Sequence, residues 1–430
     1  MPVQLLNESV RPSTLNHQLS TKLELRPFPY PFRAMLAICS DLDETPDAQV
    51  YEEQMRFLNT HETTSMGEGV DLEVGNTIYF DMLPGQFAYW NTDDAGREMA
   101  RALMRSGHID CLHSYGDLAV SRAHAMRALE ELERHQLSLK VWIDHARAPT
   151  NFGADIMQGH GDEPDHPAYH ADLTLRHGVR YVWRGRVTSV IGQDRPVSLI
   201  RLPSALCPRT TLAAQAKEAA KQVFGWAGHR KYAFHATNRV CSLTRLRDDR
   251  RVFEFLRCNP HPRGLDNGDT GFGIAEVLTP RFLDRLVERE GFCLLYTHLG
   301  KLDGDRKGFN RAAIESFRLL ARYQQEGKVL VTTTRRLLDF SQTARRVTYS
   351  ASTQGEKAVI EIALHADGSS PEVMLSRDQM DGLTFYISDS KAVEIYVNRQ
   401  EVIGAIVNPP DESGRRSVSI PWSKLKFPQL

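Results

Sequence analysis

The 430-residue sequence has almost no excess of either charge. It contains 53 Lys and Arg residues against 54 Asp and Glu residues, which gives a formal net charge of −1 at pH 7. A protein that follows a nucleic-acid backbone needs a positive surface, so nucleic acid is not an expected partner. No run approaches the roughly 18 apolar residues that span a bilayer, and residues 1–32 lack the basic and apolar regions of a secretory signal. We therefore expect no membrane span.

Cysteine is scarce, and the six cysteines form no CxxC pair. Cys39, Cys111 and Cys293 lie within apolar segments, as unpaired thiols do in proteins of a reducing compartment. We therefore expect a cytoplasmic protein. No GxGxxG motif follows the first apolar segment, and no GxxxxGK[ST] motif occurs in the chain. A dinucleotide-binding or P-loop function consequently has no support.

Apolar segments alternate with amphipathic segments from residue 33 to residue 343. Eight of them have strand character, namely 33–40, 76–80, 108–112, 139–144, 179–183, 252–257, 292–297 and 328–333. Segments between them, such as 309–325, place apolar residues three and four positions apart, which is typical of a helix packed on one side. This alternation predicts an α/β fold with parallel strands, either a (β/α) barrel or a doubly wound sheet.

The C-terminal part of the chain has a different pattern. After residue 343 the segments are short, rich in β-branched residues and alternating, and turn sequences such as ADGSSP and NPPDESG separate them. We expect three parts in the chain: an N-terminal extension over 1–32, an α/β domain over 33–343, and a small antiparallel β-sandwich over 344–430.

Polar residues follow the predicted strands at four separate places. SDLDE follows the first strand, HSYGD the third, DHARAPTNFG the fourth and HLGK the seventh. In (β/α) barrels the functional residues lie at the carboxyl ends of the strands, so these four segments would meet at one edge. This recurrence favours the barrel over the doubly wound sheet.

The HSYGD segment is a candidate metal site. His113 and Asp117 are four residues apart and would share one face of a helical turn, so both could reach one divalent ion. Asp41 or Asp43, at a neighbouring strand end, could supply a third ligand. The alternative is that His113 is a core or capping residue and Asp117 a solvated acid at a helix start.

Three later segments carry further candidates. The loop after the fourth strand contains Asp144, His145, Arg147 and Asn151. An arginine beside an acid cluster would hold a carboxylate in its ionised form, although Arg147 could instead be a surface ion-pair partner. His298 ends the apolar strand 292–297 and could act as a general acid or simply terminate the strand. In the segment 159–170 we expect Asp162 and His170 to point inward if this loop covers a substrate.

These segments, in this order, resemble the motifs of the polysaccharide deacetylase family, also called the NodB-homology or carbohydrate esterase family 4 domain. The family has an aspartate pair after its first strand, an HSxxH motif, an RxPxG loop and a late strand-end histidine. Here SDLDE, HSYGD, RAPTNFG and YTHLGK stand in their places. The resemblance covers about residues 33–340 and implies a distorted (β/α) barrel of about seven strands. The C-terminal all-β sandwich expected from the alternating pattern lies beyond the residues that the resemblance covers.

The resemblance also implies a role for each matching residue. Asp41 would be the catalytic base, Arg147 the residue that tethers it, and His298 the general acid. The implied metal ligands are Asp43, His113 and Asp117, the last of which replaces the second histidine of the family. The other polar candidates have no counterpart in the family motifs and are assigned to substrate binding; they are Asp144, His145, Asn151, Asp162 and His170.

The implied function is a divalent-metal-dependent hydrolase that removes an acetyl or formyl group from the nitrogen of an amino sugar. The implied cofactor is one divalent ion, zinc first, with cobalt, nickel and manganese as alternatives. The expected substrate is a nucleotide- or lipid-linked precursor of a bacterial surface polysaccharide such as O-antigen or capsule; homo-oligomerisation stays open. Two alternatives also remain: a catalytically degenerate barrel that binds carbohydrate, and hydrolysis of another non-peptide C–N bond.

Overall fold

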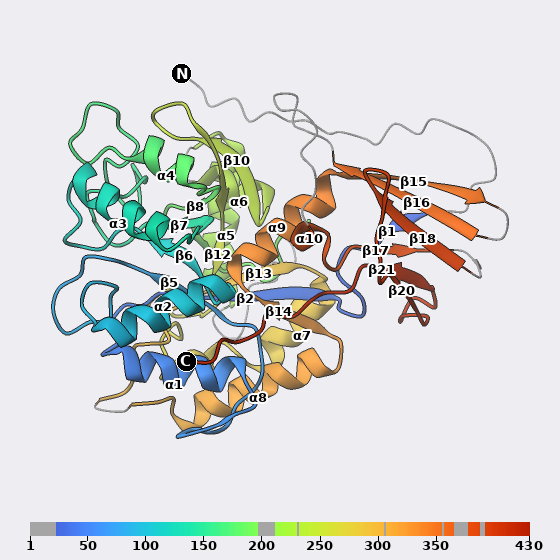
Figure 1. Cartoon of the computed structure of the whole chain (residues 1–430), viewed down its shortest axis with the longest axis horizontal. Coiled ribbons are helices and arrows are strands. Elements are labelled where there is room, and N and C mark those ends of the chain that lie inside the picture. Colours follow the sequence, from blue (N-terminus) through green and yellow to red (C-terminus); the bar gives the residue numbers. More distant parts are fainter. Residues whose placement is uncertain are drawn as a thin grey trace. The chain divides into compact units, whose positions relative to one another are not determined.

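The computed structural model describes residues 23–196, 211–229, 232–304, 307–354, 357–364, 377–387 and 392–430. The chain divides into two compact units. An α/β unit contains Ala34–Leu338 together with Leu425–Leu430, and a β-rich unit contains Asp339–Lys424 together with the N-terminal residues up to Arg33. Figure 1 shows the elements of each unit.

Eleven strands form one curled sheet in the α/β unit, and amphipathic helices surround it (Figure 1). The strands are β2 (Ala34–Ser40), β5 (Gly75–Ile78), β6 (Ile109–His113), β7 (Val141–Ile143), β8 (Tyr181–Trp183), β9 (Val187–Thr188), β10 (Cys241–Arg245), β11 (Arg251–Phe255), β12 (Arg257–Cys258), β13 (Phe292–Thr297) and β14 (Val329–Thr332). Their order is β10-β11-β8-β7-β6-β5-β2-β13-β12-β9, with β14 also paired to β2. The eight predicted strands are all present, and the segment 252–257 contributes to both β11 and β12.

The strand pairing explains why the sheet curls. β11 pairs with β8, whereas β12, which follows after the single residue Leu256, pairs with β13. These pairs are parallel, as is β2 with β5 and with β13, and β10 with β11 is an antiparallel exception. One bent segment thus contacts strands from both halves of the sheet. The mixed α/β class predicted from the alternating segments is confirmed.

Helices lie around this sheet, and the last of them continues past Leu338, the boundary of the α/β unit. They are α1 (Ala48–Asn59), α2 (Asp94–Ser106), α3 (Arg122–Arg134), α4 (Ala171–His177), α5 (Thr211–Trp226), α6 (Ala233–Thr237), the 3-10 turn η3 (Ile274–Glu276), α7 (Pro280–Arg289), α8 (Arg311–Gln325) and α9 (Thr334–Arg346). Phe317 and Leu320 of α8 are buried in the same cluster as Leu36 of β2. Asp47 caps α1 by accepting the Val50 N–H, and Asp93 caps α2 by accepting the Gly96 N–H. Each cap stabilises its helix start by about 1 kcal/mol.

The β-rich unit contains two four-stranded sheets. The first has the order β1 (Glu24–Leu25), β17 (Thr384–Tyr386), β21 (Ser417–Ser419), β20 (Ile406–Asn408), and the second the order β15 (Val347–Gln354), β16 (Lys357–Leu364), β18 (Ala392–Val397), β19 (Gln400–Glu401). A short helix, α10 (Arg377–Met380), precedes β17. The expectation of a wholly antiparallel arrangement is wrong, because β16 and β18 pair in parallel. Between β16 and β18 the chain forms β17, which belongs to the other sheet. This crossover allows β16 and β18 to run in the same direction.

The two ends of the chain do not form separate or terminal parts, as the expected order of three consecutive parts would require. The described N-terminal residues belong to the β-rich unit, and the last six residues belong to the α/β unit. Residues 1–22 of the predicted N-terminal extension lie outside the described residues, and Glu24–Leu25 pairs with β17 in the β-rich unit. At the other end, Leu425 donates its N–H to Glu73 at 2.8 Å, and the Phe427 ring lies 5.1 Å from the ring of His108. The last six residues are therefore held by the α/β unit. A small hairpin of β3 (Thr63–Thr64) and β4 (Gly67–Glu68) completes the elements.

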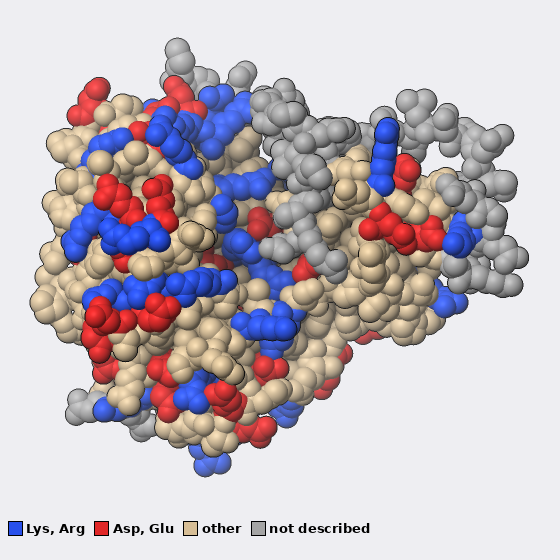
Figure 2. Space-filling model, in the orientation of Figure 1, with Lys and Arg blue, Asp and Glu red and all other residues tan. Residues whose placement is uncertain are grey.

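The surface agrees with the balanced charge of the sequence. Basic and acidic side chains lie beside one another over much of the face shown in Figure 2. Among the described residues, none of the helices combines the length and the apolar character needed to cross a membrane.

Candidate active site

Several predicted site residues lie together at the carboxyl ends of neighbouring strands. Asp41 directly follows β2, His113 is the last residue of β6, His145 lies two residues after β7, and His298 directly follows β13. The Asp41 N–H donates to the Thr297 carbonyl at 2.8 Å and so fixes the end of β2 to the end of β13. These ends surround a pocket of about 290 Å³ lined by Asp41, Asp43, His113, Asp144, His145, Ala146, Met157, Trp183, Asp266, Asp269, Thr270, Tyr296, His298 and Lys301.

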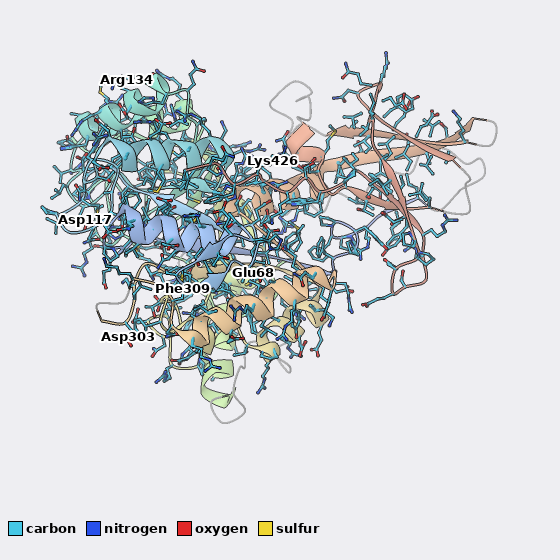
Figure 3. All side chains as sticks on the ribbon, turned by 60° about the horizontal axis from the view of Figure 1, so that its bottom comes forward. Glu68, Asp117, Arg134, Asp303, Phe309 and Lys426 are labelled. Atoms are coloured by element: carbon cyan, nitrogen blue, oxygen red, sulfur yellow. The ribbon has the colours of Figure 1, made fainter. Side chains whose placement is uncertain are left out.

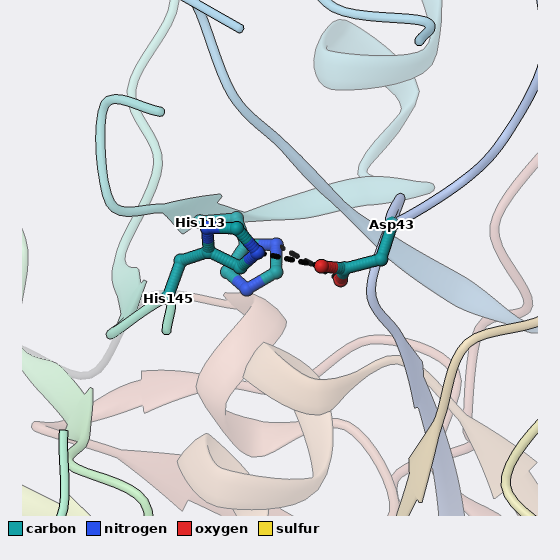
Figure 4. A group of neighbouring side chains, drawn as sticks. All are labelled: Asp43, His113 and His145. Atoms are coloured by element: carbon teal, nitrogen blue, oxygen red, sulfur yellow. Dashed lines mark hydrogen bonds and ion pairs between the residues drawn. The ribbon is translucent and has the colours of Figure 1, made fainter. Parts of the chain in front are cut away.

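Asp43, His113 and His145 form a group that could hold a metal ion. One ligand atom of each lies within 4.8 Å of the others, and Figure 4 shows both imidazole rings directed towards the Asp43 carboxylate. His145 Nε2 is 2.5 Å from Asp43 Oδ1, and His113 Nδ1 is 3.9 Å from Asp43 Oδ2. Asp43 Oδ2 is buried without a hydrogen-bond partner, which a cation would satisfy. Two histidines and one carboxylate are a common ligand set of catalytic zinc sites.

The electrostatics of these three residues also fit a cation. Burial lowers the pKa of His113 to about 4, so this imidazole is neutral at pH 7, the form that binds metals. Burial alone would lower the pKa of His145 as well, but its hydrogen bonds to Asp117 and Asp43 raise it to about 10. The surrounding carboxylates therefore favour positive charge at this position, and either an imidazolium or a metal ion can provide it.

Asp117 does not occupy the position expected for a ligand. Its Oδ1 atom lies 2.7 Å from His145 Nδ1, the ring nitrogen opposite the one that faces Asp43; Asp117 is labelled in Figure 3. The expected helical turn is not formed, because His113 ends a strand and Ser114 turns the chain with a φ of 43°. His145, predicted as a substrate contact, lies beside Asp43 and His113, where Asp117 was expected as the third ligand. A carboxylate at the outer nitrogen fixes the orientation of a ligating imidazole.

Asp41 is held by an arginine that differs from the predicted one. Arg257, the first residue of β12, donates to Asp41 Oδ2 at 2.6 Å and to Oδ1 at 2.7 Å. Both side chains are buried: that of Asp41 is 2% exposed and that of Arg257 is 0% exposed. Burial would raise the pKa of Asp41, but Arg257 outweighs it and lowers the pKa below its ordinary value. Arg147 is exposed on the loop after β7, and the contacts that hold Asp41 come from Arg257. The expected tether is therefore corrected to Arg257.

The Arg257 guanidinium is itself fixed by aromatic rings. Its Cζ atom lies 4.5 Å from the ring centre of Trp183 and 5.4 Å from that of Tyr296. Cation–π contact of this kind favours a desolvated guanidinium. The Cys39 thiol also accepts from Arg257 at 2.7 Å. The base candidate is thus oriented by a guanidinium that has little freedom to move.

His298 faces Asp41 and Asp43 across the pocket. Its Nε2 atom is 3.8 Å from Asp41 Oδ2 and 3.6 Å from Asp43 Oδ2. Its Nδ1 atom lies 2.7 Å from Oδ2 of Asp269, a residue that the sequence motifs did not indicate. This pairing places the proton-carrying or proton-accepting Nε2 atom towards the pocket, as an acid–base histidine requires.

The other predicted substrate contacts are mostly structural. Asp144 lines the pocket, but it accepts hydrogen bonds from Trp142 Nε1 and from two backbone N–H groups of the following loop. Asn151 Oδ1 accepts the His145 N–H at 2.9 Å and shapes that loop. Asp162 and His170 are fully buried and do not line the pocket. Asp162 binds Arg247, and His170 is bonded to Thr150 and Thr174, because the 159–170 segment packs inward on the fold.

Each residue of the candidate metal group is followed by a residue in the left-handed region. Glu44, Ser114 and Ala146 have φ values of 58°, 43° and 43°. This conformation costs a non-glycine residue about 1–2 kcal/mol, and such strain is concentrated at functional sites. Three independent chain segments are therefore bent sharply at the point where they deliver a side chain to one place.

Comparison of the chain with protein-family models, with curated proteins and with solved structures gave no match. Its function is accordingly inferred from the geometry of the pocket, together with the resemblance of its short motifs.

Proposed function

We propose that this protein is a divalent-metal-dependent hydrolase that removes an N-acyl group from an amino sugar, on a barrel of the NodB-homology type. One observation supports the proposal most strongly. The Asp43, His113 and His145 group lies beside two further residues, an ionised carboxylate held by a buried arginine and a histidine held by a carboxylate. Amide hydrolysis needs these three elements: an electrophile, a base and an acid.

The proposed roles follow from the contacts of each side chain. Asp43, His113 and His145 would hold the ion, zinc first, and Asp117 would orient His145. A bound divalent ion supplies Lewis-acid polarisation of a carbonyl oxygen and a lower pKa of water.

Proton transfer falls to the two paired residues. Asp41 is ionised beside Arg257 and is placed to accept a proton from the attacking water. His298 is placed to donate the Nε2 proton to the leaving nitrogen. Asp269, at 2.7 Å from Nδ1, fixes the tautomer and stabilises the imidazolium.

Metal analysis tests the ligand assignment. We expect bound zinc in the wild type, loss of zinc in His113→Ala and in His145→Ala, and weakened but detectable zinc in Asp117→Ala. Arg147→Ala is the matched control and should bind zinc as the wild type does. Full zinc binding by His145→Ala together with its loss in Asp117→Ala would reverse our assignment of these two residues.

Activity tests the reaction. Acetate or formate release from N-acyl amino sugars is expected in the wild type and should fall by at least about 100-fold in Asp41→Asn, since general base catalysis contributes about 10²–10⁴-fold. A zinc-loaded wild type that binds these sugars without releasing acid would instead favour the alternative of a non-catalytic carbohydrate-binding barrel.

A further inference from the structure

The last turns of helix α5 expose apolar side chains and bury a polar one. Val223, Phe224 and Trp226 are 50%, 50% and 58% exposed, whereas Gln222 is only 2% exposed and Gly225 is buried. A surface helix normally packs its apolar side chains on the protein and exposes its polar side chains. Because this helix end has the reverse orientation, its three apolar side chains form an exposed patch, which we call the α5 patch.

Contacts with α6 fix the orientation of this helix end. Gly225 lies against the carbonyl of Tyr232, the residue that begins α6, so closely that a Cβ atom on Gly225 would come within 2.4 Å of that oxygen. The ring of Phe224 stacks on the ring of Tyr232, with 5.8 Å between their centres. Turning the α5 patch inward would break both contacts, so its exposure is a property of the fold.

The part of the chain that carries the patch is strongly basic, although the whole chain is nearly neutral. Between Asp194 and Asp248 the sequence contains ten Lys and Arg residues and a single acid, Glu218. Arg195 and Arg247 form ion pairs with acids of other segments. Five of the remaining cations lie in or beside α5 and α6 in the sequence, namely Lys217, Lys221, Arg230, Lys231 and Arg239. The surroundings of the α5 patch therefore favour an anionic partner.

We infer that the α5 patch docks the protein on an anionic lipid surface. Trp and Phe side chains insert at the boundary between headgroups and acyl chains, and nearby Lys and Arg side chains bind anionic headgroups. Hydrocarbon accommodates Val223 as well as the aromatic rings, whereas stacking on nucleic-acid bases uses aromatic rings only. An ordinary protein surface mixes both charges and matches a one-sign segment less well.

This docking is separate from the proposed hydrolase site. None of the described residues in 211–239 lines the pocket, so lipid binding and hydrolysis can be measured independently. A protein that binds vesicles without releasing acid would contradict only the proposed function, and one that releases acid without binding vesicles would contradict only the docking.

Vesicle flotation with the full chain tests the inference. We expect binding to phosphatidylcholine vesicles that contain about 30% phosphatidylglycerol, and little binding to phosphatidylcholine alone. Binding should weaken as the salt rises from about 100 mM to about 500 mM, because screening shortens the range of the attraction.

Two sets of substitutions separate the charge from the apolar contact. Lys217→Gln together with Arg239→Gln should weaken binding about fivefold for each charge, the factor that about 1 kcal/mol gives. Trp226→Ala should weaken it about tenfold, because the exposed indole no longer enters the lipid. Phe272→Ala is the matched control, since Phe272 is also a half-exposed aromatic residue, at 49%, and it should bind as the wild type does.

Trp226 fluorescence provides a direct signal of insertion. Among the five tryptophans of the chain, all within the described residues, Trp226 alone is exposed. Anionic vesicles should shift the emission of the wild type to shorter wavelength, and Trp226→Phe should still bind but lose the shift. Equal binding to both kinds of vesicle, binding to neither, or wild-type binding by Trp226→Ala would overturn the inference. A shift with a single-stranded oligonucleotide but not with vesicles would assign the α5 patch to nucleic acid instead.

Discussion

Replacing Arg257 by methionine probes the buried ion pair at the centre of the site. The guanidinium donates to both oxygens of Asp41 at 2.6 and 2.7 Å, and both partners are almost fully buried. Methionine keeps much of the side-chain length but leaves the Asp41 charge without its partner. Breaking a buried pair from one side costs about 3–5 kcal/mol, because the remaining charge is neither solvated nor compensated. We expect the free energy of unfolding to fall by that amount.

Urea titration at pH 7.5 measures this change, with Arg147→Met as the matched control. Arg147 is exposed, so its replacement should alter the free energy of unfolding by no more than about 0.5 kcal/mol. The double variant Asp41→Asn with Arg257→Met removes both charges, and its cost should be smaller than the sum of the two single costs. Equal stability of the two methionine variants, or simple additivity in the cycle, would refute the pair as the main constraint on Asp41.

The same pair has a predictable pH dependence. Since Arg257 lowers the pKa of Asp41 in the folded protein, the stabilisation is present above the ordinary aspartate pKa of about 3.9 and is lost as the pH falls through the folded value. The difference in the free energy of unfolding between the wild type and Arg257→Met should therefore be constant near neutral pH and should become smaller in acid.

Three further predictions concern strain, a buried acid and the C-terminal residues. Ala146 has a φ of 43°, so Ala146→Gly should raise the free energy of unfolding by up to about 1 kcal/mol and Ala146→Val should lower it, as urea titration would show. Burial raises the pKa of Asp110 to about 6, so the fold favours its protonated form and loses up to about 3 kcal/mol of stability as the pH rises from about 4 to about 6. Asp110→Asn should abolish that loss, and unchanged titration curves would contradict the assignment. Deletion of residues 425–430 removes the contacts of Leu425 with Glu73 and of Phe427 with His108, and we expect it to lower the thermal midpoint of the α/β unit by an amount equivalent to about 2 kcal/mol.

The site residues at the strand ends could be predicted from the sequence, because the same local pattern marks a strand and the site residue that follows it. An apolar segment that stops at a polar residue identifies both the strand and the residue exposed at its end, and Asp41, His113 and His298 were found in this way. Parallel strands align these ends at one edge of the sheet. Local pattern plus topology is therefore sufficient to bring residues together that are far apart in the chain.

Arg257 and Asp269 could not be predicted from the sequence, because neither residue is marked by a local pattern. Arg257 begins a two-residue strand after a break at Leu256, and it is 216 positions from Asp41. In the sequence, VFEFLR looks like one ordinary strand that ends in a surface arginine. Asp269 lies in a loop without regular structure and contacts His298 across 29 positions. Neither residue has a periodic or spacing signal, because its role depends on how the sheet bends.

The exchange of roles between Asp117 and His145 follows from the spacing of strands. Two histidines four residues apart can share a metal only if the chain after the strand turns helically, whereas here Ser114 adopts a left-handed conformation and directs Asp117 elsewhere. The neighbouring strand β7 ends about 5 Å from β6, the usual distance between paired strands, so a histidine just past its end reaches the same point. Asp117 then binds the outer nitrogen of His145 at 2.7 Å. A carboxylate in place of the second histidine is consequently compatible with a complete three-residue group, and the departure from the HSxxH pattern need not indicate a decayed site.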